Sequence, residues 1–185
     1  VNDGSNDKTK ILLEENIKNL KFSNQIINHK KNQGYGASLK TGLRNSNNDT
    51  IAICDIDLTY PIEDLKKLYD LYSNGNLDMI VGERVFEKNS DNFYKKIGRS
   101  IIRKLIKLVV NDKITDFNSG LRIFNKKIVM ENLNFYPNKF SFTTTSTILM
   151  TMGNKNIQYL PIKYSVREGQ SKIKVFDFFR FLKLV

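Results

Sequence analysis

Two aspartates, Asp55 and Asp57, stand one residue apart directly after the apolar run 51–54. That run is typical of a buried strand, and in open α/β sheets ligands bind beyond the carboxyl ends of the strands. Mg²⁺ and Mn²⁺ prefer hard oxygen ligands, often one or two carboxylates together with the phosphates of a substrate. The pair therefore indicates a divalent-metal site for a phosphorylated substrate, although an Asp-x-Asp pair also occurs by chance in surface turns.

A second polar loop, residues 2–7, reads Asn-Asp-Gly-Ser-Asn-Asp and leads into a predicted helix. The acidic side chain of Asp3 and the backbone N–H groups of such a loop can contact a nucleoside and its phosphates. The alternative interpretation is a turn that only caps the helix.

The composition favours an anionic partner. The 185 residues contain 30 Lys and Arg against 19 Asp and Glu, which gives a net charge of +11,. The single cysteine and single histidine argue against an internal disulfide and against a Cys/His zinc site, so the composition fits a reducing, cytosolic compartment,. We expect His29 to lie at the surface and the thiol of Cys54, in the apolar strand, to be packed in the core. The apolar runs are shorter than the ~20 residues that span a bilayer.

The spacing of apolar residues switches between helical and strand periods, which predicts an α/β fold with a mostly parallel sheet flanked by helices. The length suits one domain. Strands are expected at 25–28, 50–54, 78–81, 120–124 and 158–166, and helices at 8–20, at 37–45, from 61 onward and at 141–152. The chain starts without Met and enters the loop 2–7 at once, so we expect a fragment truncated at both ends and lacking its first strand.

Residues 93–110 combine an apolar stripe with a basic remainder, which predicts a cationic amphipathic helix,. It is either a surface helix with a solvated face or a helix that lies on anionic lipid. The segment 172–185 has a similar apolar and basic character and also suits a membrane interface.

Seven motifs in order resemble the family-two glycosyltransferases of the GT-A fold, in particular the branch with dolichyl-phosphate mannose synthase and bacterial polyprenyl-phosphate glycosyltransferases. The resemblance covers essentially the whole chain. The motifs are VNDGSNDKT (1–9), NQGYGASLKTGL (32–43), CDIDLTYPIEDL (54–65), VGERV (81–85), TDFNSGLRIFNKKIV (115–129), FSFTTTSTILM (140–150) and LPIKYSVREGQSKIK (160–174).

On the donor side, the resemblance implies that Asp3 contacts the nucleoside. Asp55 and Asp57, the family's DXD motif, would flank the diphosphate and hold Mg²⁺ or Mn²⁺, with Asp57 the main ligand. Two departures weaken the match around the donor: Asn2 replaces a usual Asp, and Glu83 stands where a small residue is common.

On the acceptor side, the resemblance places Arg84 near the diphosphate or the acceptor phosphate and Asp116 near the sugar and acceptor. Arg122, grouped with the substrate-binding residues, would mainly organise the loop that carries Asp116. A further set would clamp phosphate, namely Arg167, Ser171 and Lys172.

The expected activity is transfer of a sugar, with inversion, from a UDP- or GDP-sugar to polyprenyl phosphate at the cytoplasmic face of a membrane with an anionic surface. Residues 1–174 would form the catalytic domain and 175–185 the start of an amphipathic interface helix. The alternative is a family-two enzyme that acts on a saccharide acceptor in cell-surface polysaccharide synthesis, with Asp116 as the base. Homo-oligomer formation stays open.

Two interpretations from other classes compete with an enzyme. A nucleic-acid-binding module fits the charge, but the aromatic residues fall mostly in apolar runs and no RNA- or DNA-binding motif occurs, so we expect no nucleic acid partner,. A membrane scaffold without activity would tolerate Asp57→Ala, whereas the enzyme would lose turnover.

Overall fold

The computed structural model describes residues 1–85 and 114–165. The predicted helix 93–110, the tail 172–185 and the phosphate clamp of Arg167, Ser171 and Lys172 lie outside the described residues. The elements in chain order are α1 (Thr9–Ile17), α2 (Tyr35–Asn45), β1 (Thr50–Ile53), α3 (Asp64–Asn74), β2 (Met79–Val85), β3 (Arg122–Asn125), α5 (Lys126–Glu131), the 3-10 turn η1 (Leu133–Phe135), α6 (Phe142–Met152) and β4 (Ile157–Lys163).

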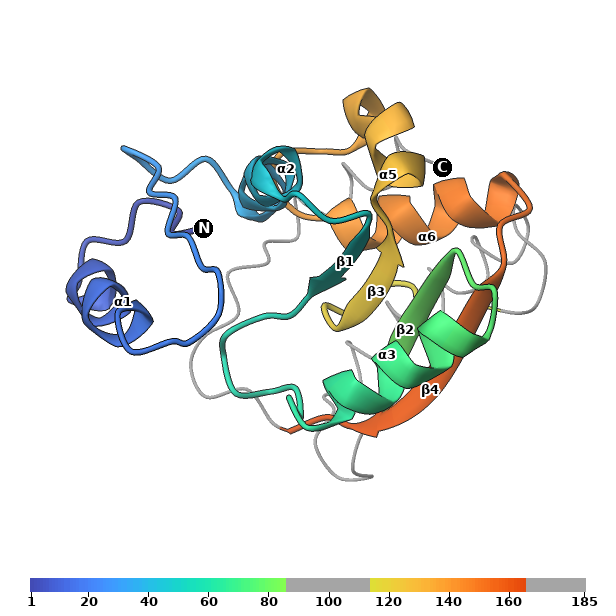
Figure 1. Cartoon of the computed structure of the whole chain (residues 1–185). Helices are drawn as coiled ribbons and strands as arrows, with labels where there is room; N and C mark the ends of the chain where they lie inside the picture. Colours follow the sequence, from blue (N-terminus) through green and yellow to red (C-terminus); the bar gives the residue numbers. More distant parts are fainter. Residues whose placement is uncertain (86–113, 166–185) are drawn as a thin grey trace, which may run out of the picture.

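The described strands form one sheet in the order β1-β3-β2-β4 (Figure 1). β2 and β4 pair in parallel, and β3 pairs antiparallel with both β1 and β2. Strands β1, β2 and β4 therefore share one direction, as the alternating pattern predicts, while β3 makes the sheet mixed. Pro161 lies on β4 at the edge of this sheet, where a missing N–H costs no ladder bond on the open side,.

Both faces of the sheet are covered, which gives the α/β layering that the sequence predicts. Met79 and Val81 of β2 pack with residues of α2 and α6 on one face. Ile80 between them packs with Leu68 of α3 on the other. In Figure 1, α3 crosses one side of β2 and β4. The period of two in β2 thus explains how one strand joins two separate apolar clusters.

The structure differs from the sequence-based expectation at two elements. The strand predicted at 25–28 is wrong: this stretch contributes only an isolated parallel bridge between Asn2 and Asn28. The short helix α5 was not predicted, and it begins where the Asn125 side chain accepts a hydrogen bond from the Lys127 N–H. Among the residues that the structure describes, no helix is long and apolar enough to cross a bilayer.

Candidate active site at the carboxyl edge of the sheet

Three chain segments that carry the predicted site residues meet at one edge of the sheet. Asp55 and Asp57 follow the carboxyl end of β1, and Arg84 lies in the carboxyl half of β2. Because β3 runs antiparallel, its amino end and the preceding loop 116–121 reach the same edge. The mixed topology therefore brings Asp116 next to strands from which it is distant in sequence.

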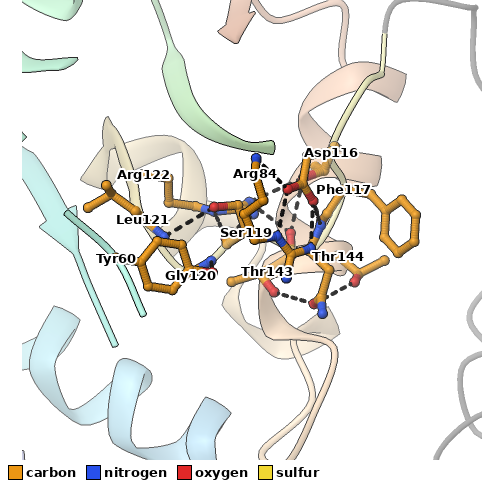
Figure 2. A network of polar contacts seen from close by, with 12 residues as sticks. Tyr60, Arg84, Asp116, Phe117, Ser119, Gly120, Leu121, Arg122, Thr143 and Thr144 are labelled. Carbon is orange, nitrogen blue, oxygen red and sulfur yellow. Dashed lines mark hydrogen bonds and ion pairs between the residues drawn. The ribbon is translucent and has the colours of Figure 1, made fainter. Parts of the chain in front are cut away.

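Arg84 and Asp116 form a nearly buried, two-pronged ion pair (Figure 2). Arg84 Nε lies 2.7 Å from Asp116 Oδ2, and Arg84 Nη2 lies 2.8 Å from Oδ1. The backbone N–H groups of Arg84 and Asn118 donate to the same carboxylate at 3.1 and 3.0 Å. A carboxylate has about four lone-pair positions, so these four donors occupy all of the positions at which Asp116 can accept a hydrogen bond.

The environment keeps Asp116 ionised. Burial by itself raises the pKa of this carboxyl, but the hydrogen bonds and charge of Arg84, helped by the Asn118 and Arg84 N–H groups, outweigh it and lower the pKa below its ordinary value,. A carboxylate with a lowered pKa and four donors is a weak proton acceptor. Its evident role is to hold the Arg84 guanidinium.

Arg122 is fully buried, with 0% of its surface exposed. Its guanidinium donates to the Ser119 carbonyl and, across to α6, to the Thr143 carbonyl at 2.9 Å and the Thr147 hydroxyl at 3.1 Å. Burial lowers the pKa of Arg122. This residue ties the loop 116–121 to α6, which agrees with an organising role and leaves it no surface for direct contact with substrate.

The amino-terminal turn of α6 is joined to the same loop. The hydroxyl groups of Thr143 and Thr144 donate to the Asn118 side-chain oxygen at 2.7 and 3.1 Å (Figure 2). Both threonines are buried. The Thr-rich segment therefore supports the loop that carries Asp116.

Asp55 is packed against the loop on one side and against α2 on the other. A Cβ added at Gly120 would lie 2.5 Å from Asp55 Oδ2, so a larger residue here would displace this carboxylate. Tyr35 of α2 lies near Asp55, and the pKa of its phenol is raised, chiefly by burial and then by the Asp55 charge. The Tyr60 hydroxyl accepts the Gly120 N–H at 2.7 Å and fixes that backbone.

Asp57 lies two residues after Asp55 in the loop that follows β1. Its Oδ1 accepts hydrogen bonds from the backbone N–H and the hydroxyl of Thr59. Within the described residues no group of three or more His, Cys, Asp or Glu side chains gathers to hold a metal ion. Two carboxylates fit a hard cation such as Mg²⁺ or Mn²⁺ whose other ligands are water and substrate phosphate.

Gly120→Ala tests whether this close packing positions Asp55. The added methyl group must displace the carboxylate, so we expect a loss of about 1–3 kcal/mol in the free energy of unfolding, measured in urea, together with weaker Mn²⁺-dependent nucleotide binding. Gly42→Ala in α2 is the matched control, because its Cβ would meet only Val1 at 3.7 Å and alanine favours helix,. Equal effects of the two substitutions would contradict the role of Gly120.

Asp3 is held by hydrogen bonds that could not be predicted from the sequence. Its Oδ1 accepts from the Gln33 N–H at 2.9 Å and contacts His29 Nδ1 at 2.7 Å, and its Oδ2 accepts from the Gly34 N–H at 2.8 Å. Burial raises the pKa of Asp3, but these hydrogen bonds outweigh it and the pKa is lowered. The expectation that His29 is a surface residue is wrong, since its side chain is 7% exposed.

The start of α2 connects Asp3 with Asp55. The Gly34 N–H donates to Asp3, and the next residue, Tyr35, lies near Asp55, whose charge raises the pKa of its phenol. Gly34 has a φ of 108° and lies against Asn138, where a Cβ would collide with the carbonyl oxygen. The two carboxylates expected to meet the two ends of a nucleoside diphosphate thus lie beside neighbouring residues at the start of α2.

Two known proteins are similar to almost the whole of this chain. A low-salt glycan biosynthesis hexosyltransferase of Haloferax volcanii is 26% identical over 182 residues, covering 95% of this chain and 42% of that protein. A dolichyl-phosphate hexose transferase of the same organism is 24% identical over 176 residues, covering 94% of this chain and 72% of that protein. The chain thus spans less than half of the first relative.

The fold matches that of solved GT-A sugar transferases. The crystal structure of glucosyl-3-phosphoglycerate synthase from Mycobacterium tuberculosis, in complex with Mn²⁺ and uridine-diphosphate-glucose, superposes with a TM-score of 0.67 at 12% identity. The matched region covers 98% of this chain and 63% of the chain of the M. tuberculosis enzyme. The sequence pattern of the family described as "Glycosyl transferase family 2" matches residues 1–133, well over half of the chain. The chain therefore belongs to glycosyl transferase family 2.

Proposed function

We propose that the protein containing this chain transfers a hexose or related sugar from a UDP- or GDP-sugar to polyprenyl phosphate at the cytoplasmic face of a membrane. Asp55 and Asp57 would hold Mg²⁺ or Mn²⁺ against the donor diphosphate, and Asp3 would contact the nucleoside. A relative named as a dolichyl-phosphate hexose transferase supports the acceptor class. The M. tuberculosis neighbour, solved with Mn²⁺ and a nucleotide sugar, supports the donor and the metal.

The ionisation and hydrogen bonding of Asp116 favour a phosphate acceptor over a sugar hydroxyl. A sugar hydroxyl must lose a proton as it attacks, and its enzyme needs a positioned base. Asp116, the candidate for that task, accepts four hydrogen bonds and has a lowered pKa. A phosphate acceptor is already an anion and attacks without giving up a proton, so a site with this carboxylate suits it better.

The proposed step is a single displacement. An oxygen of the acceptor phosphate forms a bond to the anomeric carbon while the bond from that carbon to the donor diphosphate breaks, which inverts the configuration. The electron pair leaves with the nucleoside diphosphate, and a bound divalent metal would stabilise its growing charge. Arg84, held in place by Asp116, supplies a fixed positive charge at the same edge.

The experiment is a transfer assay with the intact protein, Mn²⁺ and labelled UDP- or GDP-sugars. Undecaprenyl phosphate, the corresponding polyprenol and an oligosaccharide serve as separate acceptors. We expect label in an acid-labile, lipid-extractable product with the phosphate alone. Label that appears only in oligosaccharide would contradict the proposal and favour a saccharide acceptor.

A further inference from the structure

His29 lies between the candidate nucleoside contact and helix α2. Its Nδ1 is 2.7 Å from Asp3 Oδ1, and its Nε2 is 2.9 Å from the Thr41 hydroxyl. The side chains of His29 and Asp3 are 7% and 18% exposed. A histidine with both ring nitrogens engaged and almost no exposed surface has one fixed orientation.

The contacts define which atoms carry hydrogen. Asp3 is ionised, because its pKa is lowered, and an ionised carboxylate only accepts hydrogen bonds,. Nδ1 therefore carries a hydrogen and donates a hydrogen bond to Oδ1. In the neutral ring Nε2 accepts the Thr41 hydroxyl, which links the pair to the middle of α2,.

Asp3 then has limited capacity for another partner. Its Oδ1 takes the His29 ring and the Gln33 N–H, while its Oδ2 takes the Gly34 N–H. Of about four lone-pair positions, the contacts with described residues use three and leave one on Oδ2. The orientation of the carboxylate thus decides where one further N–H donor, such as that of a base, meets it.

We propose that His29 is a positioning residue for the nucleotide donor: it fixes the Asp3 carboxylate between the loop 32–34 and α2, so that the remaining lone pair of Oδ2 points at the nucleoside. This inference rests on the proposed function. His29 itself touches no substrate and takes no part in the displacement. Its loss therefore weakens nucleotide binding rather than the chemical step.

Two amide substitutions separate the ends of the imidazole. Asparagine places its amide nitrogen near the position of Nδ1, so His29→Asn keeps a donor for Asp3. Glutamine reaches toward the position of Nε2, so His29→Gln keeps a partner for Thr41 and removes the donor to Asp3. Without that donor the Asp3 carboxylate is no longer held in one orientation.

The measurement is calorimetric binding of UDP and GDP to the intact protein with Mn²⁺, together with KM and kcat for the nucleotide sugar. We expect His29→Gln to bind about tenfold more weakly, with KM raised by a similar factor, kcat unchanged and the Mn²⁺ concentration for half-maximal activity unchanged. His29→Asn should stay within about threefold of the unsubstituted protein.

Thr41→Val is the matched control for the other end of the ring, and each variant's melting temperature reports any loss of fold. Normal binding by His29→Gln, or equally weak binding by both amide variants, would overturn the inference alone. A fall in kcat with KM unchanged would do the same. Absence of UDP and GDP binding by the unsubstituted protein would instead contradict the proposed function itself.

Discussion

Asp57→Asn is expected to lower turnover by about 10³-fold while the fold is retained. Asparagine removes the negative charge that a divalent cation needs, but its side-chain oxygen can still accept the two hydrogen bonds from Thr59. Sugar transfer measured at saturating donor tests the activity. Urea unfolding tests the fold, and binding of nucleoside diphosphate with and without Mn²⁺ tests the site independently of turnover.

Asp70→Asn is the matched control for this substitution. Asp70 lies on α3 and pairs with Lys66 at 3.0 Å, with more than half of its side chain exposed. We expect no change in turnover and a change in the free energy of unfolding of less than about 0.5 kcal/mol. An Asp57→Asn enzyme that retains full turnover, or that still binds nucleotide more tightly with Mn²⁺, would contradict the assignment of Asp57.

Arg84→Gln is expected to be the most destabilising single change at the candidate site. It leaves the Asp116 charge buried without its partner, and breaking a buried pair in this way costs about 3–5 kcal/mol. It also removes the contact of the guanidinium with the Tyr164 ring, whose centroid lies 5.5 Å away. Urea unfolding at neutral pH measures the loss, and transfer activity should fall with it.

The double variant Arg84→Gln with Asp116→Asn provides the control. Because the second change removes the unpaired charge, we expect the double variant to be at least about 1 kcal/mol more stable than Arg84→Gln alone. Additive losses in the two substitutions would show that the ion pair is not the source of the effect.

The same pair predicts a pH dependence. The pKa of Asp116 in the folded chain is below its ordinary value of 3.8, so its contribution to stability is present above pH 3.8 and is lost as the pH falls further,. In Arg84→Gln, burial without the partner raises this pKa instead, and stability is regained as the pH falls through the raised value. The difference between the two proteins in urea unfolding should therefore shrink on acidification, and a constant difference would contradict this account.

The sequence could predict which residues lie at the edge of the sheet, because that follows from local order. Asp55 and Asp57 follow an apolar strand closely, and β1 ends at Ile53, within one residue of the end of the run 51–54. The direction of β3 could not be predicted, since the pattern of a short strand is the same in either direction. That direction places the loop 116–121 beside β1 and β2.

The partners of the site residues were also beyond the sequence. No local sequence pattern predicts that Tyr35 lies near Asp55 or that His29 contacts Asp3, because the partners are distant in the sequence and meet only in the folded chain. A lone histidine at the polar end of a short predicted strand is typical of the surface, but this one lies between Asp3 and Thr41 of α2. Gly120 offered a weak signal, since a glycine within a predicted strand often marks a close approach.

The most direct test of the whole account is calorimetric titration of the intact protein with UDP, GDP and their sugar conjugates, with Mn²⁺ and again with excess chelator. The account predicts that one nucleotide series binds, that Mn²⁺ tightens the affinity of its diphosphate by at least about tenfold, and that the chelator removes this gain. Equal affinity with and without the metal, or no binding of either series, would contradict the claim that Asp55 and Asp57 hold a cation against a donor diphosphate.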